Sequence, residues 1–273
     1  MGLSTHGPSF LRWAGSKRRI IPRLRHLITG AETIYVEPFC GSASLFFSAR
    51  PRSAYLSDLN DQLIASLKWM QDDPTELHRA FTSIPVSAAD YYRIRNEYNQ
   101  SQESSLDRSA MFVYLNRYCF NGLWRTNRKG HFNVPFGGVA SEAPPLEFFL
   151  RCSMSLSSAR LENCDFRLTL ESEFTPNHFI FIDPPYFTES ARTFLEYGPK
   201  TFGWLDLLAL HGRLQLIREQ GARIAMVYCD VPEVRDLFRG WTIETVSVTR
   251  NVGGFAARRK VEREVLITSF SVG

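Results

Sequence analysis

The stretch HFIFIDPPYF, residues 178–187, carries the strongest structural signal in the chain. Its first half is a run of apolar and aromatic residues, which is typical of a buried β-strand. Two prolines follow Asp183, and because proline fixes φ and disfavours a helix before it, the strand must lead into a stiff loop. Open α/β sheets bind ligands beyond the carboxyl ends of such strands. The stretch therefore predicts a strand that delivers an acid and the Tyr186 ring to a ligand site.

Strands and helices alternate in the N-terminal part, as a doubly wound sheet requires. Strand-like runs span Thr33–Val36 and Ala54–Asp58, and stretches that suit helices follow them at Leu45–Phe47 and Leu59–Met70. Strand-like runs return near the C-terminal end. Besides His178–Ile182, they are Cys164–Leu168, Arg223–Tyr228, Thr242–Val248 and Val261–Phe270.

Between these two groups of strands the pattern is helical. Helical stretches span Thr75–Phe81, Ala89–Asn99 and Arg108–Tyr118, and a loop rich in Gly, Asn and Pro runs over Asn121–Pro145. We therefore expect one α/β catalytic domain, residues 1–72 and 159–273, interrupted by a mostly helical insertion, residues 73–158.

The composition is that of a folded globular protein. Of the 273 residues, 44% are hydrophobic and 22% charged, which argues against global disorder. No apolar run approaches the roughly 20 residues needed to cross a bilayer, and Met1–Phe10 lacks the pattern of a secretory signal. The five cysteines are scattered and form no C-x-x-C pair, which favours reduced thiols in a cytoplasm over disulfides or a zinc site. They are Cys40, Cys119, Cys152, Cys164 and Cys229.

The formal charge is only +4, but basic residues gather in three segments. Segments that converge on one face would suit a phosphate backbone. Three separate solvated surfaces are the other interpretation, and charge alone favours it. The segments hold Arg12, Lys17, Arg18, Arg19, Arg23 and Arg25; Arg117, Arg125, Arg128 and Lys129; and Arg250, Arg258, Arg259, Lys260 and Arg263.

The sequence EPFCGSAS, residues 37–44, follows the first predicted strand. A glycine at the end of a strand lets a ligand approach the backbone, and Asp58 follows Gly41 by about 17 residues. A second-strand acid near that spacing can bind a ribose hydroxyl. A full G-x-G-x-x-G is absent, so a dinucleotide is not indicated, and a tight turn without a ligand remains an equal interpretation.

The DPPY sequence offers two acceptors and a ring. Asp183 supplies a carboxylate, Pro184 keeps its carbonyl, and Tyr186 can stack on a base. Two acceptors that hold both N–H groups of an aromatic amine favour its pyramidal geometry and expose its lone pair. The alternative is a proline-rich strand exit without a ligand.

At this point the chain resembles the Dam-like family of DNA adenine-N6 methyltransferases, and the resemblance spans nearly the whole chain. The order of its segments, with the cofactor loop first, the recognition region next and the catalytic sequence last, is that of the family's α class. The matching segments are LRWAGSK (11–17), VEPFCG (36–41), LSDLN (56–60), YLNRY (114–118), NGLWR (121–125), FNVPFG (132–137) and DPPY (183–186).

The resemblance implies a Rossmann-like, seven-stranded S-adenosylmethionine-dependent methyltransferase fold with a helical target-recognition insert. It also implies a set of site residues and no metal. Catalytic roles fall to Asp183, Pro184 and Tyr186. Contacts to S-adenosyl-L-methionine fall to Trp13, Lys17, Phe39, Gly41, Asp58, Asp165, Phe166 and Asp183. DNA contacts fall to Arg12, Phe120, Asn121, Arg125, Asn127 and Pro135.

Several DNA contacts have a plainer interpretation. Arg125 can read guanine with its guanidinium or bind a phosphate, and Phe120 can enter the base stack or lie in the core. Pro135 can touch a thymine methyl group or only shape a turn. The chain also departs from the family at Ser16, Ala43 and Gly138, so the family's frequent target GATC is an expectation.

The function implied is transfer of a methyl group from S-adenosyl-L-methionine to adenine N6 in a short site of double-stranded DNA. The adenine is expected to leave the duplex before direct in-line transfer. We expect a monomeric, cytoplasmic and nucleoid-associated protein of bacterial or phage origin. The rival hypotheses are a catalytically inactive DNA-binding module and a methyltransferase of RNA or of a protein amide.

Overall fold

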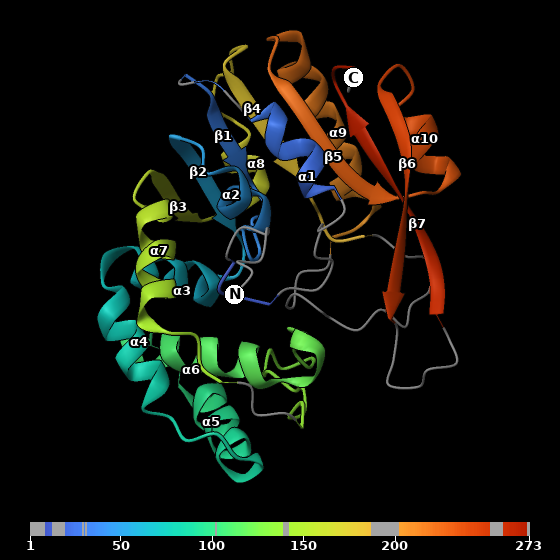
Figure 1. The fold of residues 1–273 in the computed structure, drawn as a ribbon. Helices are drawn as coiled ribbons and strands as arrows, with labels where there is room; N and C mark the ends of the chain where they lie inside the picture. Colours follow the sequence, from blue (N-terminus) through green and yellow to red (C-terminus); the bar gives the residue numbers. More distant parts are fainter. Residues whose placement is uncertain are drawn as a thin grey trace.

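The structure is a computed structural model, which describes residues 9–12, 20–28, 30, 32–101, 103–138, 142–186, 202–251 and 259–271. Its described strands form a seven-stranded sheet in the order β3-β2-β1-β4-β5-β7-β6 (Figure 1). This confirms the expected methyltransferase-like α/β fold. The strands are β1 (Ile34–Glu37), β2 (Ser53–Asp58), β3 (Ala159–Asn163), β4 (His178–Ile182), β5 (Arg223–Cys229), β6 (Thr242–Asn251) and β7 (Arg259–Thr268).

The sheet is parallel except at β7, which pairs antiparallel with both β5 and β6. At the centre, β1 pairs in parallel with β2 on one side and with β4 on the other. The strand order reverses between β1 and β4, and ligands of open α/β sheets bind at such a reversal. The loops after β1 and β4 therefore meet where the fold provides a binding site.

Helices cover both faces of this sheet, and β4 is accordingly apolar and buried from Phe179 to Ile182 instead of alternating. Its Phe179 and Phe181 enter one hydrophobic core, and its Ile180 and Ile182 enter the other. Helices α1 (Ile21–Leu24), α2 (Ser44–Ala49) and α3 (Asp61–Asp72), with the short η1 (Arg25–Leu27), lie on the first side. Helices α8 (Phe166–Thr169), α9 (Trp204–Glu219) and α10 (Pro232–Leu237) lie on the second.

A group of helices lies below the sheet in Figure 1, where the sequence predicts the helical insertion. Three of its helices begin at side-chain caps: Asp73, Ser87 and Ser105 each accept a hydrogen bond from a backbone N–H of the first turn. The helices are α4 (Pro74–Thr82), α5 (Ala88–Gln100), α6 (Leu106–Tyr118), the short η2 (Phe120–Gly122) and α7 (Leu146–Leu156). The sequence pattern does not predict helices α1, α7, α9 and α10.

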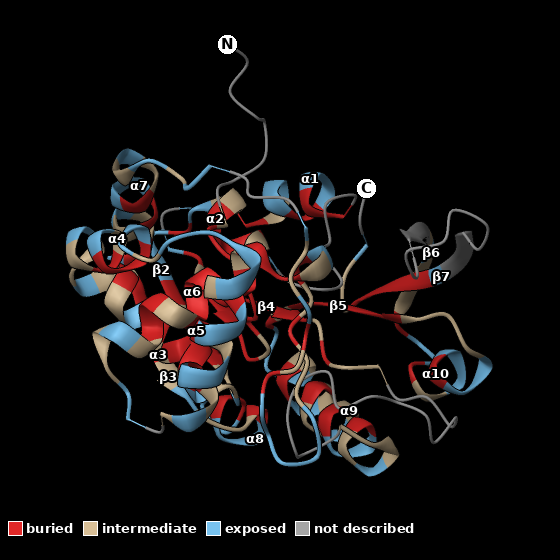
Figure 2. Cartoon of the chain, turned by 90° about the horizontal axis from the view of Figure 1, so that it is seen from below, coloured by how far each residue is buried: buried red, intermediate tan, exposed pale blue. Residues whose placement is uncertain are grey.

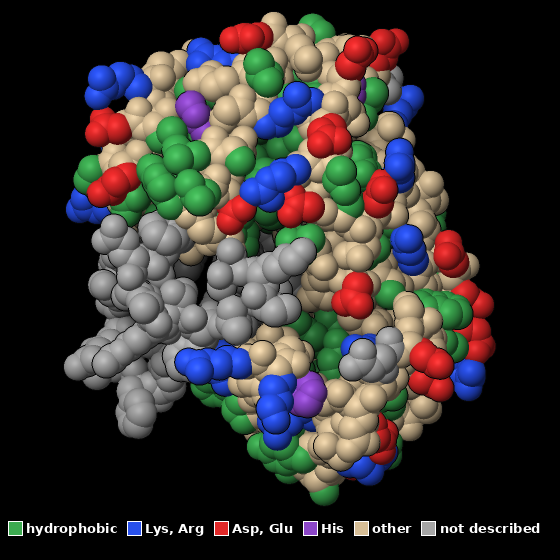
Figure 3. Space-filling view, turned by 180° about the vertical axis from the view of Figure 1, so that it is seen from behind, with side chains coloured by type: hydrophobic (Ala, Val, Ile, Leu, Met, Phe, Trp, Pro, Cys, Tyr) green, Lys and Arg blue, Asp and Glu red, His purple; other side chains and the backbone are tan. Residues whose placement is uncertain are grey.

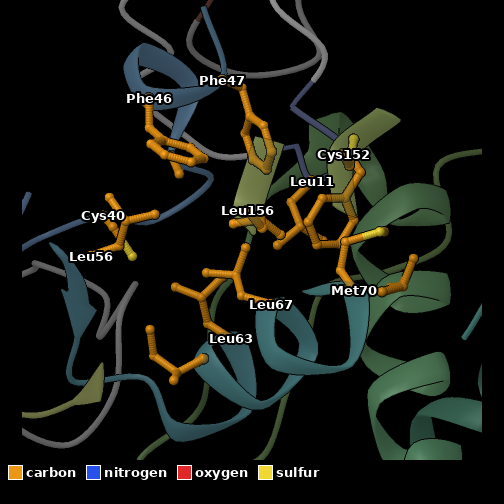
Figure 4. Close-up of a cluster of buried hydrophobic side chains, with 14 of the residues drawn as sticks. Leu11, Cys40, Phe46, Phe47, Leu56, Leu63, Leu67, Met70, Cys152 and Leu156 are labelled. Carbon is orange, nitrogen blue, oxygen red and sulfur yellow. The ribbon is translucent and has the colours of Figure 1, made fainter. Parts of the chain in front are cut away.

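The sheet and the helical group share one core. Figure 4 shows buried side chains from α2, β2, α3 and α7 pointing toward one another, among them Phe47, Leu56, Leu67 and Leu156. Helix α3 contacts β2 and β3 as well as α6 and α7. In Figure 2 the buried residues run through the sheet into α3 and α6, while α5 carries exposed residues. The helical group is therefore packed firmly onto the sheet.

One predicted strand is wrong. The hydrophobic pattern predicts a strand over Cys164–Leu168, but β3 ends at Asn163 and α8 begins at Phe166. Asp165 caps this helix, because its Oδ1 accepts a hydrogen bond from the backbone N–H of Arg167 at 2.9 Å. The true strand lies at the edge of the sheet and carries polar residues, so its hydrophobic pattern is weak.

No helix in the described ranges is long and apolar enough to cross a membrane.

Candidate active site

The loop after β1 is fastened to the end of β2. The backbone N–H of Cys40 donates to the carbonyl of Ser57 at 3.0 Å, and that of Gly41 donates to Asp58 Oδ2 at 3.0 Å. Gly41 has φ of 45°, in the left-handed region that favours glycine. The predicted glycine and acid are thus in direct contact at the carboxyl edge of the sheet.

The Asp58 carboxylate has a second backbone donor. Its Oδ1 accepts from the N–H of Asn60 at 2.9 Å. Burial raises the pKa of Asp58, and the N–H groups of Asn60 and Gly41 act in the opposite direction. A carboxylate offers about four acceptor positions, so each Asp58 oxygen keeps capacity for a ligand hydroxyl.

Aromatic rings lie beside this loop. The rings of Phe39 and Phe166 stack with centroids 5.2 Å apart, and Phe202 packs edge-on against Phe39 at 5.8 Å. The guanidinium of Arg167 covers Phe166, with 4.6 Å from its carbon to the ring centroid, and forms an ion pair with Asp165. The predicted residues Phe39, Asp165 and Phe166 therefore gather at one place. The sequence analysis missed Phe202, which has no flanking motif to identify it.

Asp183 leaves β4 beside the end of β1, where carboxyl groups accumulate. Glu37 at that end is only 3% exposed and accepts a hydrogen bond from the Tyr35 hydroxyl at 2.9 Å. Burial raises the pKa of Glu37 well above its usual range, and the charges of Asp183 and Asp58 act in the same direction. Glu37 therefore carries a proton more readily than an exposed glutamate, which lowers the repulsion between the acids around it.

Tyr186 is held at two points. Its hydroxyl donates to Glu264 Oε1 at 2.8 Å, and its ring packs against Tyr228 with centroids 5.0 Å apart and planes 56° from parallel. Tyr228 comes from β5 and Glu264 from β7. Sequence reasoning missed both residues because each lies inside a strand with no motif around it.

The segment between α6 and α7 folds back on itself. Isolated β-bridges join Cys119 to Phe136 and Thr126 to Phe132. We call residues 119–136 the recognition hairpin. At its tip the predicted DNA contact Asn127 accepts, through Oδ1, the backbone N–H groups of Lys129 at 2.9 Å and His131 at 3.1 Å. Asn127 therefore shapes the tip, which exposes Lys129.

Helix α5 supports this hairpin through side chains one turn apart. The Tyr91 hydroxyl and the Arg95 guanidinium both donate to the carbonyl of Val134, at 2.9 and 3.2 Å. Asn99 bonds both the carbonyl and the N–H of Phe132, at 3.0 and 2.8 Å. Trp124 is buried and stacks on Phe132 with centroids 4.4 Å apart. The hairpin is therefore a loop on a rigid support.

Arg125 lies on the first arm of the hairpin and is partly exposed. Its Nε donates to Asn133 Oδ1 of the other arm at 2.9 Å. Asn121 and Pro135 are exposed, whereas Phe120 is partly buried and packs against the core. Figure 3 shows Lys and Arg side chains gathering beside a His in the part of the molecule where the hairpin lies.

Residues 9–12 contact both the loop after β1 and helix α6. The Ser9 hydroxyl donates to the carbonyl of Ser42 in the loop after β1, at 2.7 Å. Asn116 of α6 bonds both backbone groups of Arg12, at 2.8 and 2.6 Å, and the Arg12 side chain is exposed. A Cβ on Gly122 would lie 2.6 Å from that of Arg12, so the hairpin approaches this segment closely. The predicted cofactor contacts Trp13 and Lys17 lie outside the described residues.

No group of three or more His, Cys, Asp or Glu that could hold a metal occurs among the residues that the structure describes. The expectation that the enzyme needs no metal remains a prediction.

Comparison with known proteins adds an independent finding. The family described as D12 class N6 adenine-specific DNA methyltransferase matches residues 13–252. The chain is 27% identical over 270 residues to the type II methyltransferase M1.LlaDCHI of Lactococcus lactis subsp. cremoris, covering 96% of this chain and 95% of that protein. It is 29% identical over 268 residues to a DNA adenine methylase of Haemophilus influenzae, covering 96% and 93%. It is 31% identical over 268 residues to a DNA adenine methylase of Vibrio cholerae, covering 94% of each.

Proposed function

The chain belongs to the D12 class of N6 adenine-specific DNA methyltransferases, and from this premise we propose how its residues divide the work of the reaction. The enzyme uses S-adenosyl-L-methionine, which supplies an electrophilic methyl group. The proposal assigns cofactor binding to the loop after β1, chemistry to the loop after β4, and DNA reading to the recognition hairpin. Residues 73–158 form the recognition part in this proposal, and residues 1–72 and 159–273 form the catalytic part.

The cofactor site consists of the Gly41 backbone, the Asp58 carboxylate and the paired rings of Phe39 and Phe166. Asp58 would accept a ribose hydroxyl, since its two oxygens keep acceptor capacity beyond Gly41 and Asn60. The aromatic pair would contact the adenine ring. Trp13, Lys17, Asp165 and Asp183 complete the proposed set.

Catalysis rests on acceptors that are already oriented. The Asp183 carboxylate and the Pro184 carbonyl would accept the two N–H groups of the target amine, and the Tyr186 ring would stack on the base. The observation that carries this proposal is the register of the sheet: β1 lies between β2 and β4, so the loops holding Gly41, Asp58 and Asp183 leave neighbouring parallel strands.

DNA reading is assigned to the exposed side of the recognition hairpin. Arg125 is partly exposed and is braced by Asn133, so its guanidinium can keep one orientation toward a guanine. Arg12, Phe120, Asn121, Asn127 and Pro135 are the further proposed contacts. The target is a short duplex site, and GATC is the sequence to test first.

One chain carries every proposed residue, which supports a monomeric enzyme. The five cysteines are free thiols in the structure, which supports a reducing cytoplasm. The named relatives come from bacteria, and one more belongs to Escherichia phage P1.

The central test is transfer of radiolabelled methyl groups to DNA, RNA and protein in parallel. We expect label in DNA only, at adenine N6, and we expect Asp183→Ala to abolish it while the melting temperature stays close to wild type. Asp236→Ala, on the exposed side of α10, is the control and should keep full activity. A folded Asp183→Ala enzyme with activity within a few-fold of wild type would rule out the assigned role.

The assignment of Arg125 has its own test. Arg125→Ala should cost about 1–3 kcal/mol on the cognate site and relax discrimination at one base pair. Arg128→Ala, at the exposed tip of the same hairpin, should weaken all sequences alike and reduce the salt slope by roughly 1. Activity is measured on GATC duplexes and single-base variants at several salt concentrations. Equal proportional losses of Arg125→Ala on cognate and variant duplexes would make Arg125 a backbone contact.

A further inference from the structure

We propose that Glu264 is a positioning residue, which fixes the Tyr186 ring in the orientation that receives the target adenine. The inference rests on the proposed role of Tyr186 in stacking on that base. It adds a residue that lies 78 positions after Tyr186 in the chain.

The contact joins a partly exposed ring to a buried acid. The Tyr186 hydroxyl donates to Glu264 Oε1 at 2.8 Å, and Glu264 is 2% exposed. Glu264 sits within paired strands, opposite Cys229 of β5 and Val246 of β6. Its position is therefore set by backbone pairing on both sides, which gives the tyrosine hydroxyl a fixed acceptor.

A carboxyl group at this buried position is unfavourable unless it forms hydrogen bonds. The next residues along β7, Val265, Leu266 and Ile267, are at most 1% exposed and fill the two cores. A buried carboxyl group is destabilising unless hydrogen bonds compensate it. An apolar residue would fill this position without that cost, so an acid here is consistent with a hydrogen-bonding role, and the bond to Tyr186 is such a role.

The geometry shows what the bond can do for stacking. A tyrosine ring moves about two side-chain torsions. The hydroxyl lies on the axis of the second torsion, so an anchor there restricts the first torsion and fixes where the ring lies. Tyr228 packs against the ring, with centroids 5.0 Å apart and planes 56° from parallel, so it limits rotation of the ring about the second torsion. The bond to Glu264 supplies the second restraint. Pre-organised groups of this kind raise the rate by avoiding reorganisation during reaction.

The experiment compares variants at both ends of the bond. Glu264→Leu removes the acceptor, Tyr186→Phe removes the donor, and Glu264→Gln keeps an acceptor oxygen. We measure kcat, KM for duplex DNA, the Kd for S-adenosyl-L-methionine, the melting temperature, and the fluorescence of 2-aminopurine placed at the target adenine. Glu244→Leu, the same change on neighbouring β6, is the matched control because Glu244 pairs with Arg23 away from Tyr186.

We expect Glu264→Leu and Tyr186→Phe each to lower kcat about tenfold, with cofactor affinity unchanged. The double variant should be no slower than either single variant, because both changes remove one bond. Glu264→Gln should recover most of the rate, and the 2-aminopurine signal of Glu264→Leu should change while that of Glu244→Leu should not.

Two results separate this inference from the role on which it rests. If Tyr186→Ala keeps the wild-type rate, the proposed role of Tyr186 is wrong. If Tyr186→Ala is slow but Glu264→Leu is as fast as wild type, only the positioning role is wrong. Additive losses in the double variant, or a loss in melting temperature with unchanged kcat, would make Glu264 a structural residue and would also overturn the inference.

Discussion

The protonation of Glu37 can be tested through the pH dependence of stability. Burial raises its pKa well above the usual value, so the folded protein binds a proton more tightly than the unfolded chain does. The stability from this proton is complete below the unfolded pKa, about 4.3, and is lost as pH rises through the folded pKa. Glu37→Gln keeps an acceptor for Tyr35 but cannot titrate. We therefore expect its free energy of unfolding to fall less than that of wild type as pH rises.

Chemical denaturation at a series of pH values measures this difference. Glu162→Gln is a control of opposite sign, because the hydrogen bond from Tyr55 lowers the pKa of Glu162. The stability that Glu162 contributes is present above its unfolded pKa and is lost as pH falls, so wild type should lose this stability on the acid side while Glu162→Gln should not. Parallel curves for wild type and Glu37→Gln would contradict the shifted pKa.

Asp58 carries a prediction about the cofactor. Its carboxylate combines two backbone bonds with capacity for a ribose hydroxyl. Asp58→Ala should weaken S-adenosyl-L-methionine binding without DNA by about 1.5–3 kcal/mol, the usual value of a hydrogen bond to a charged group. Calorimetry measures the affinity, with Asp61→Ala in the first turn of α3 as the control. Unchanged binding by Asp58→Ala would remove Asp58 from the cofactor site.

At the scale of single residues, the sequence predicts what short motifs carry. Gly41, Asp58 and Asp183 stand at strand ends, where composition and spacing signal a ligand site. Glu264 and Tyr228 lie in the interior of strands, and their contact with Tyr186 depends on which strands become neighbours. No local pattern encodes that choice, so only the three-dimensional structure reveals these residues.

Among the elements, α5 supports a prediction about both stability and DNA binding. Asn99 satisfies both backbone groups of Phe132, which is buried. Asn99→Ala should lower the free energy of unfolding by about 1–3 kcal/mol, because it leaves buried polar groups without their partner. It should also weaken DNA binding while cofactor affinity stays unchanged, since the hairpin loses its support.

Thermal unfolding and separate titrations with DNA and with S-adenosyl-L-methionine test this pair of effects. Asn96→Ala lies on the exposed side of the same helix and is the matched control. Equal DNA affinity for wild type and Asn99→Ala would mean that α5 stabilises the hairpin without influencing recognition.

Elements with strong periodicity or clear caps are predicted well, and polar edges are not. The expected helices correspond to α2 to α6, and α3, α5 and α6 begin at an Asn or Ser cap. The edge strand β3 is predicted five residues too late. The charged residues Arg160 and Glu162 weaken its hydrophobic pattern, while the apolar residues of α8 give a strand-like pattern. Edge strands are often short and charged, which prevents pairing with other chains, and these charges weaken the hydrophobic pattern by which strands are predicted.

For the whole molecule, the sequence predicts the sheet and a group of helices between its strands, and the structure shows both. The sequence does not predict how the parts are joined. Residues 9–12 contact the loop after β1 through Ser9 and α6 through Arg12, so one short segment links the edge of the sheet to the helical group. Such a link arises from packing between distant segments, which composition does not reveal.

The position of β7 has a consequence for how the protein is made. This strand follows β5 and β6 in the chain but lies between them in the sheet. On the ribosome, β5 and β6 therefore emerge with no strand between them, and their unpaired edges wait for a partner that is still being synthesised. Glu264 arrives on that same late strand. A nascent chain therefore cannot close the sheet, or form the hydrogen bond between Tyr186 and Glu264, until β7 has left the ribosome.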